Sequence, residues 1–193
     1  MIIMPNILKE TAEGIVRCSV HDELFKAREI ECTGEISEES VCAMIAQIRY
    51  LAREDAEKEI TLYINSTGGE IGSGLALYDV MQAVPCPIRT VCVGHASSMA
   101  AVLFASGDKR EMLPNARVMI HDPRIMGGAS GTALEIEALS RELMKKREIV
   151  AEILAKHTGK SVDEVLSKTC KDSYFNAQEA VAFGLADSVI DKL

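Results

Sequence analysis

Apolar and polar positions along this chain of 193 residues follow two different periods. Short apolar runs bounded by glycine, proline or charged residues are typical of buried strands. Such runs predict strands at residues 30–33, 60–64, 88–93 and 118–120. Between them, apolar residues recur every three or four positions and predict helices after Ser37, over 71–84 and over 98–106. Because strands and helices alternate at short spacing, the pattern predicts an α/β protein with right-handed crossovers and a largely parallel sheet.

The two ends of the chain differ from this alternation. A long helix is predicted over about 132–157, ended by Gly159. Its inward-facing residues are expected to be Leu139, Leu143, Val150, Ile153 and Leu154. A capping box at 161–164 predicts another helix, and 177–183 predicts a last short one. Residues 1–27 show no firm period and predict an arm, with a short helix near 22–27.

Composition narrows the function classes. The length favours one domain, and a net charge of −8 argues against nucleic acid or anionic membranes as partners, because both bind through Lys and Arg. The six cysteines form no CxxC pair, so we expect small buried apolar side chains rather than disulfides or a metal site. With no apolar run of membrane-spanning length and no signal-peptide pattern, we expect a cytoplasmic protein.

Three short segments carry the candidate chemistry. Ser98 stands at the predicted start of a helix, directly after a strand, where unpaired amides and the helix dipole favour negative charge. His121 ends another predicted strand, and Gly68–Gly69 follows a third. Taken singly, each has a simple structural explanation: a helix N-cap, a histidine at a sheet edge and a tight turn.

Taken together, these segments predict a single crevice, because open parallel sheets bind ligands beyond the ends of their strands. A serine hydroxyl, a histidine base and backbone donors for an oxyanion are the groups that nucleophilic attack on a carbonyl requires. The histidine also needs a carboxylate to orient it. Spacing alone leaves three candidates open: Asp122, Asp163 and Asp172.

Four motifs make the prediction more specific: INSTGG at 64–69, GHASSMAA at 94–101, LPNARVMIH at 113–121 and AQEAVAFGLAD at 177–187. In these motifs, and over essentially its whole length, the chain resembles the proteolytic subunits of the Clp protease family. The last motif also occurs in crotonases and identifies only the superfamily, whereas the serine–methionine and MIH motifs identify the protease. The resemblance implies a serine endopeptidase with a crotonase-like repeated ββα superhelix, a mostly parallel sheet, a protruding long helix and an N-terminal arm.

The same resemblance assigns roles to individual residues. Ser98 falls on the nucleophile, His121 on the general base, and Asp172 on the residue that orients the base. Gly69 and Met99 fall on the backbone N–H donors of the oxyanion hole. Three glycines fall where a substrate peptide binds as an added strand: Gly127, Gly128 and Gly131. No metal or organic cofactor is implied.

The resemblance further implies an assembly. Residues 1–20 correspond to an axial arm, and about 124–158 to a handle segment through which two heptameric rings of this subunit stack. The resulting homo-oligomer would cleave unfolded polypeptides and short peptides in a closed chamber, and ATP would belong to a partner AAA+ unfoldase. Thr61 and Ala83 stand where aromatic residues usually line the groove for that unfoldase, so we expect altered docking. Cys170–Lys171 replaces an acid–arginine pair at the ring contact, so we expect altered stacking.

Two alternatives stay open on the sequence. A crotonase-like acyl-CoA enzyme would share the scaffold and the oxyanion hole, but would work without the pair Ser98 and His121. A structural or regulatory subunit of a mixed-ring complex would keep the fold without turnover. The altered groove and ring contacts favour that second alternative, and the intact triad argues against it.

Overall fold

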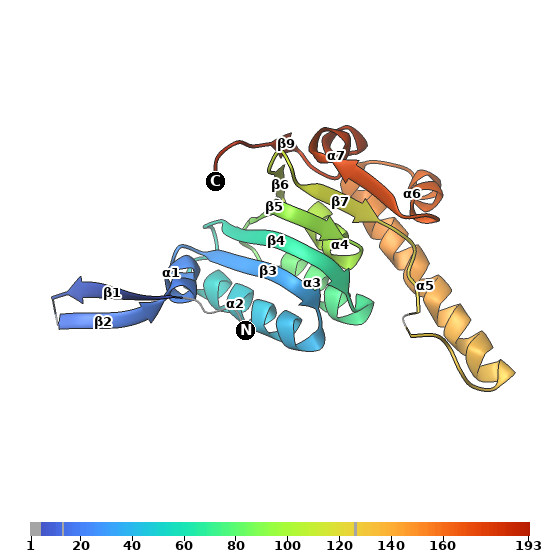
Figure 1. Ribbon diagram of the computed structural model, residues 1–193, viewed down its shortest axis with the longest axis horizontal. Helices are drawn as coiled ribbons and strands as arrows, with labels where there is room; N and C mark the ends of the chain where they lie inside the picture. The colour runs from blue at the N-terminus through green and yellow to red at the C-terminus, as the bar shows by residue number, and fades with distance from the viewer. Residues whose placement is uncertain (1–4, 13, 126) are drawn as a thin grey trace.

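The computed structural model of the chain describes residues 5–12, 14–125 and 127–193. At its centre, these residues form a seven-stranded sheet (Figure 1). Its strands are β3 (Glu29–Ile36), β4 (Ile60–Gly69), β5 (Ile88–Ser97), β6 (Lys109–Met112), β7 (Arg117–Ile120), β8 (Ser173–Asn176) and β9 (Ser188–Val189). The order along the sheet is β3–β4–β5–β6–β9, and β7 joins β5 to β8. Alternation of strands and helices thus produces the predicted α/β sheet.

The pairing within this sheet is almost entirely parallel, as predicted. Only β7 and β8 run antiparallel, while β3, β4, β5, β6 and β9 pair in parallel with their neighbours. Strand β5 pairs with β6 through residues 89–92 and then with β7 through residues 95–97. The carboxyl ends of β5 and β7 therefore lie side by side, at the place where the sequence predicted a crevice.

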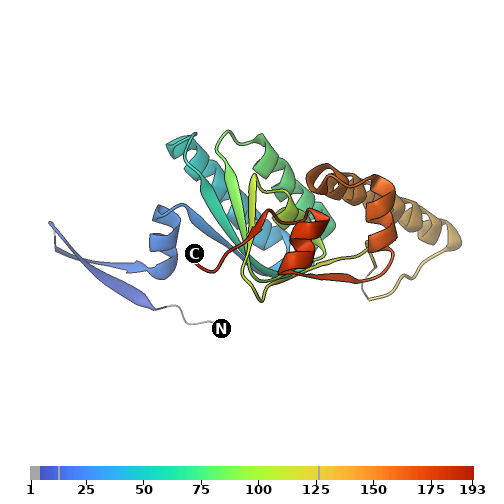
Figure 2. The same cartoon turned by 90° about the horizontal axis from the view of Figure 1, so that it is seen from above.

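Helices cover the sheet and complete the core (Figure 2). Their bounds are α1 (Val20–Lys26), α2 (Glu38–Glu54), α3 (Ile71–Ala83), α4 (Met99–Ala105), α5 (Ala133–Thr158), α6 (Val162–Thr169) and α7 (Ala177–Phe183). The apolar stripe predicted for α2 is buried at Val41, Met44, Ile48 and Leu51. Every residue of α4 is buried, which explains its continuous run of small and apolar side chains. Among the described helices, none combines the length and apolarity that a membrane span needs.

Helix α5 extends away from the rest of the chain (Figure 1). Thr132 and Glu135 form a capping box at its start, and Gly159 ends it in the left-handed conformation, as the sequence indicated. Only its C-terminal half packs on the core, through Val150 and Leu154. Leu139 was expected to face inward but is 43% exposed. The reason is that the N-terminal half of α5 projects beyond the sheet and the other helices, which cover only the C-terminal half of α5.

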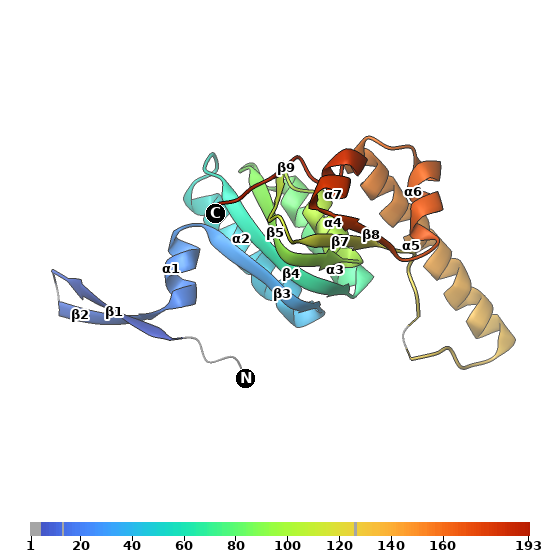
Figure 3. The same ribbon diagram turned by 45° about the horizontal axis from the view of Figure 1, so that its top comes forward.

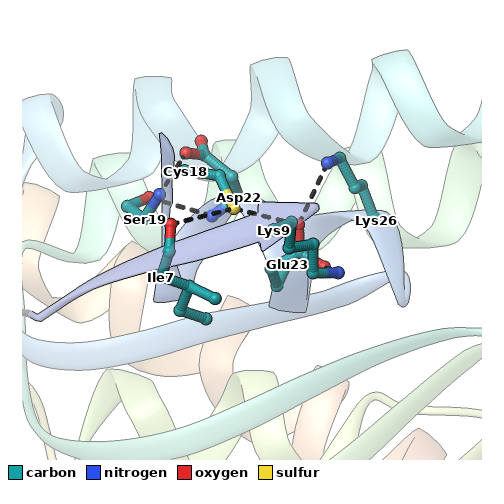
Figure 4. Close-up of polar contacts among 7 residues, drawn as sticks. All are labelled: Ile7, Lys9, Cys18, Ser19, Asp22, Glu23 and Lys26. Atoms are coloured by element: carbon teal, nitrogen blue, oxygen red, sulfur yellow. Dashed lines mark hydrogen bonds and ion pairs between the residues drawn. The ribbon is translucent and has the colours of Figure 1, made fainter. Parts of the chain in front are cut away.

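The N-terminal region is more ordered than its sequence suggested. Strands β1 (Asn6–Thr11) and β2 (Gly14–Ser19) form an antiparallel hairpin, while residues 1–4 of the predicted arm lie outside the described residues. Figure 4 shows how this hairpin joins α1: Lys9 forms an ion pair with Glu23, and the Cys18 thiol donates to the same carboxylate at 3.3 Å. A capping box between Ser19 and Asp22 starts α1 at Val20, two residues before the predicted helix.

Strand bounds also differ from the prediction. Strands β4 and β5 continue to Gly69 and Ser97, beyond the apolar runs 60–64 and 88–93, because their parallel pairing resumes after an irregularity at Ile64–Ser66. Strands β6 and β8 were not predicted, since KREM and SYFN are short and mix charged or polar residues with apolar ones. The second of these strands turns out to position the candidate site.

Candidate active site

Ser98 occupies a sharp junction between strand β5 and helix α4. Its backbone has φ 56° and ψ −124°, an unusual conformation for a residue other than glycine. The Ser98 amide donates to the Met119 carbonyl of β7 at 2.8 Å and so ties the junction to the neighbouring strand. Strained residues of this kind concentrate at functional sites. The hydroxyl therefore lies at a strand-to-helix turn, as predicted, with α4 itself starting one residue later.

The glycines at the end of β4 let that strand approach this junction closely. A Cβ atom on Gly68, where φ is +91°, would lie 2.5 Å from the Ser97 carbonyl oxygen, 2.8 Å from the Ser98 Cβ and 3.1 Å from the Met99 nitrogen. A Cβ atom on Gly69 would lie 2.2 Å from the Ile36 carbonyl oxygen of β3. Only glycine fits such approaches. The backbone at Gly68 thus packs beside the backbone of Met99, and the next residue, Gly69, packs against β3.

Ser98 and His121 line the same small cavity, together with Met99. The other lining residues are mostly apolar: Ile71, Val102, Ile120, Pro123, Val150 and Leu154. The His121 side chain is only 11% exposed. Burial, together with the neighbouring Arg124 guanidinium, lowers the pKa of His121 below its ordinary value of 6.5. The imidazole is consequently neutral at physiological pH, as a general base must be.

Strand β8 brings Asp172 to His121. In the antiparallel pair of β7 and β8 (Figure 3), Ile120 stands opposite Ser173, so the next residues outward are His121 and Asp172. The distance from His121 Nδ1 to Asp172 Oδ1 is 3.9 Å. Residues opposite each other in an antiparallel pair have Cα atoms about 5 Å apart, which explains this proximity.

The other two carboxylates that spacing left open have different surroundings. Asp122 Oδ2 accepts from Arg147 Nε of α5 at 2.7 Å. The Asp122 amide donates to the Thr169 carbonyl at 2.7 Å, which holds this residue toward α5 and α6. Asp163 stands in the first turn of α6, where a negative charge suits the helix dipole. Of the three, Asp172 is the carboxylate that the structure brings to the histidine.

Arg124 also belongs to this group, although no sequence motif or spacing pointed to it. Its Nε donates to His121 Nδ1 at 2.9 Å, and its Nη2 lies 2.6 Å from the same nitrogen. Nη2 also donates to Asp172 Oδ1 at 2.5 Å. The guanidinium therefore stands between the imidazole and the carboxylate. His121, Asp172 and Arg124 therefore form one group of three charged or titratable side chains next to the cavity that Ser98 lines.

The glycines expected to bind substrate lie apart from the cavity. The segment from β7 to α5, of which residue 126 lies outside the described part, carries no assigned strand where it is described. Gly127 and Gly128 have φ of +81° and +87°, so the backbone does not run as an extended strand at these two residues. Gly131 precedes the Thr132 cap of α5. All three are exposed, and none lines the cavity around Ser98.

The cysteines, all within the described part of the chain, are free thiols. Cys32, Cys86 and Cys92 are buried, as the apolar interpretation expected, whereas Cys42 and Cys170 are exposed and Cys18 is intermediate. Burial raises the pKa of Cys32 and of Cys92 to about 12. In the described ranges, no three Cys, His, Asp or Glu side chains gather in a way that would hold a metal ion.

A mostly parallel α/β sheet with a serine at a strand-to-helix turn, a histidine at the next strand end and an aspartate beside it is typical of serine hydrolases. Comparison with known proteins narrows this class. Residues 12–193 match the model of the family described as Clp protease. The chain is 41% identical over 192 residues to the ATP-dependent Clp protease proteolytic subunit of Dehalococcoides mccartyi, covering 98% of this chain and 95% of that protein.

The chain therefore belongs to the Clp protease family. The family, the crotonase-like fold class and the serine-type peptidase activity predicted from the motifs are confirmed. The alternative of an acyl-CoA enzyme is wrong, because the match is to the peptidase branch of the superfamily over nearly the whole chain.

Proposed function

We propose that the chain hydrolyses peptide bonds with Ser98 as nucleophile, His121 as general base and Asp172 as the residue that orients the base. The observation that carries this proposal is the shared cavity of Ser98 and His121, built from the adjoining ends of β5 and β7. The register of β7 and β8, which brings Asp172 to the same histidine, supports the third role.

In this mechanism the Ser98 oxygen attacks the scissile carbonyl carbon while His121 Nε2 takes the hydroxyl proton. The protonated His121 then gives that proton to the leaving amine, and an acyl ester remains on the serine. Water, activated by His121 in turn, hydrolyses the ester and restores the hydroxyl. The apolar walls of the cavity keep the local dielectric low, which strengthens interactions with the developing charge.

The backbone N–H groups of Gly69 and Met99 form the oxyanion hole in this proposal. The close packing of the Gly68–Gly69 turn on the first residues of α4 supports it, because this packing brings the two stretches of backbone together. Losing one such donor typically lowers kcat by about 10²–10³. The exposed glycines between β7 and α5 are proposed to bind an extended substrate peptide: Gly127, Gly128 and Gly131.

The subunit is proposed to act within two stacked heptameric rings, with residues 1–20 as an axial arm and about 124–158 as the handle segment. Apolar side chains exposed along α5 support a contact between subunits there. They are Leu134, Ile136, Leu139, Met144 and Ile149. Closed rings would confine proteolysis to unfolded polypeptides and short peptides that can enter the chamber.

An AAA+ unfoldase is the proposed partner, because the relative from Dehalococcoides mccartyi is described as part of an ATP-dependent protease. Thr61, a buried residue of β4, and Ala83, the last residue of α3, replace the aromatic residues of the usual groove. Docking is therefore proposed to rely on other contacts. We place the activity in the cytoplasm, since six free thiols suit a reducing compartment.

A fluorophosphonate probe tests the proposed function. The full chain, Ser98→Ala and the control Ser167→Ala, in which an exposed serine of α6 is changed, are labelled side by side, and size-exclusion mass is read on each sample. We expect a tetradecamer in all three and labelling lost only in Ser98→Ala. An unlabelled wild type of the same mass, with an Arg124→Ala variant unlabelled as well, would contradict the peptidase mechanism and favour a structural subunit.

A further inference from the structure

The arrangement behind Ser98 differs from the one that its proposed chemistry requires. A general-base histidine donates its Nδ1–H to a carboxylate, so that Nε2 is free to accept the serine proton. Here His121 Nδ1 and Asp172 Oδ1 are 3.9 Å apart, beyond hydrogen-bond distance. Arg124 fills the gap, with Nε at 2.9 Å and Nη2 at 2.6 Å from His121 Nδ1.

The donors of Arg124 determine where the proton of the imidazole lies. A guanidinium carries only donors and stays charged, so His121 Nδ1 must act as an acceptor. The single proton of the neutral ring is then on Nε2, the nitrogen that has to be unprotonated for general-base chemistry. Because the same guanidinium also donates to Asp172 Oδ1 at 2.5 Å, it occupies the carboxylate as well. The Arg124 side chain thus prevents His121 Nδ1 from donating to Asp172 and leaves the ring proton on Nε2.

Charge acts in the same direction as hydrogen bonding. Burial and Arg124 both lower the pKa of His121, whereas Asp172 and Asp122 raise it. Asp122 is itself paired with Arg147 of α5 at 2.7 Å. The arginine beside the ring therefore opposes formation of the imidazolium that the attack step produces.

We propose that Arg124 is a positioning residue that holds the site in a resting state. Its withdrawal from His121 lets the ring proton move from Nε2 to Nδ1, where Asp172 accepts a hydrogen bond from Nδ1–H. This inference rests on the proposed roles of Ser98, His121 and Asp172. The side chains of Arg124 and Asp172 are 49% and 42% exposed, so the ion pair between them is solvated and can be exchanged. A shift of about 1 Å would bring the carboxylate into hydrogen-bond distance of the imidazole.

The test measures the rate of fluorophosphonate labelling of the full chain between about pH 5 and 9. Arg124→Ala is compared with wild type and with the control Arg53→Ala, which changes an exposed arginine in the last turn of α2. We expect Arg124→Ala to be labelled about tenfold faster at neutral pH, because removing the guanidinium restores the productive tautomer. The acidic limb of the pH–rate profile of Arg124→Ala should move to higher pH, because the pKa of His121 rises once the guanidinium is gone. Arg53→Ala should match wild type.

Two further variants test whether the faster labelling of Arg124→Ala depends on Asp172. In the double variant Arg124→Ala with Asp172→Ala, the gain should disappear, because the gain depends on the carboxylate. Arg124→Gln replaces Arg124→Ala if the latter changes the size-exclusion mass. A wild type labelled at Ser98, with Arg124→Ala no faster and its pH profile unmoved, would overturn the inference and leave the proposed function standing. Absence of labelling in wild type and in every variant would overturn both.

Discussion

The strongest test of how the fold positions the candidate nucleophile is a single added methyl group, Gly68→Ala. Gly68 has φ +91°, a conformation that costs an alanine about 1–2 kcal/mol. Its new Cβ would start 2.5 Å from the Ser97 carbonyl oxygen and 2.8 Å from the Ser98 Cβ. Both contacts involve the backbone or the Cβ of the junction itself, so no flexible side-chain end can absorb them.

The expected magnitude follows from these distances. Ordinary van der Waals contacts of a Cβ atom begin at 3.4 Å, so the Ser97 carbonyl must retreat by about 0.9 Å. Ser98 follows directly in the chain and has to move with it. A misplacement of about 1 Å in an active site lowers activity by about 10²-fold. We therefore expect the Gly68→Ala variant to be labelled by a fluorophosphonate about 100 times more slowly than wild type.

Gly72→Ala is the matched control for this substitution. Gly72 lies in the first turn of α3, no atom stands within 4 Å of the place that an added Cβ would take, and alanine favours the helix. It should be labelled at the wild-type rate and unfold at the same temperature or higher. If Gly68→Ala keeps its labelling rate within about threefold of wild type, the tight turn does not position Ser98 and the reasoning fails.

Two further predictions concern a buried cation and the pH profile. Arg28, only 3% exposed, donates to four backbone carbonyls, one in the last turn of α2 and three in the loop that leads to β4: Leu51, Asp55, Lys58 and Glu59. Arg28→Met should lower the free energy of unfolding by about 3 kcal/mol in urea titrations, and a loss below about 1 kcal/mol would contradict this. For wild-type peptide hydrolysis, the acidic limb of kcat/KM should lie below pH 6.5, because the pKa of the His121 base is lowered; a limb at or above 6.5 would refute that assignment.

The sequence predicted those helices and strands in which buried and exposed side chains follow a regular pattern. The stripe of α2 and the apolar runs that begin β4 and β5 are buried, so their patterns follow the core directly. The hairpin of β1 and β2 is almost wholly exposed, so its sequence shows no alternation of buried and exposed residues from which strands could be predicted. Strand β8 is four residues long and only Phe175 within it is buried, which is too little for a period.

The same contrast applies to the candidate site. Ser98 and His121 could be proposed from residues alone, because both stand at the ends of predicted strands. Asp172 could be chosen only through family resemblance, because the register that brings it to the histidine belongs to the unpredicted strand β8. Arg124 carried no signal at all: its place depends on the path of an irregular segment and on the conformation of a long side chain.

His121, Asp172 and Arg124 also differ in how firmly the fold holds them, and this difference indicates that Arg124 is the residue that moves. The ladder of β7 and β8 holds the backbone directly before His121 and directly after Asp172, through the pair Ile120 and Ser173. Arg124 lies beyond the end of β7, in a segment described without regular structure, and half of its side chain faces solvent. The two residues that must meet are held by the sheet, and the residue that separates them is the least constrained of the three. Release of Arg124 therefore requires no change in the fold, only a new partner for its guanidinium.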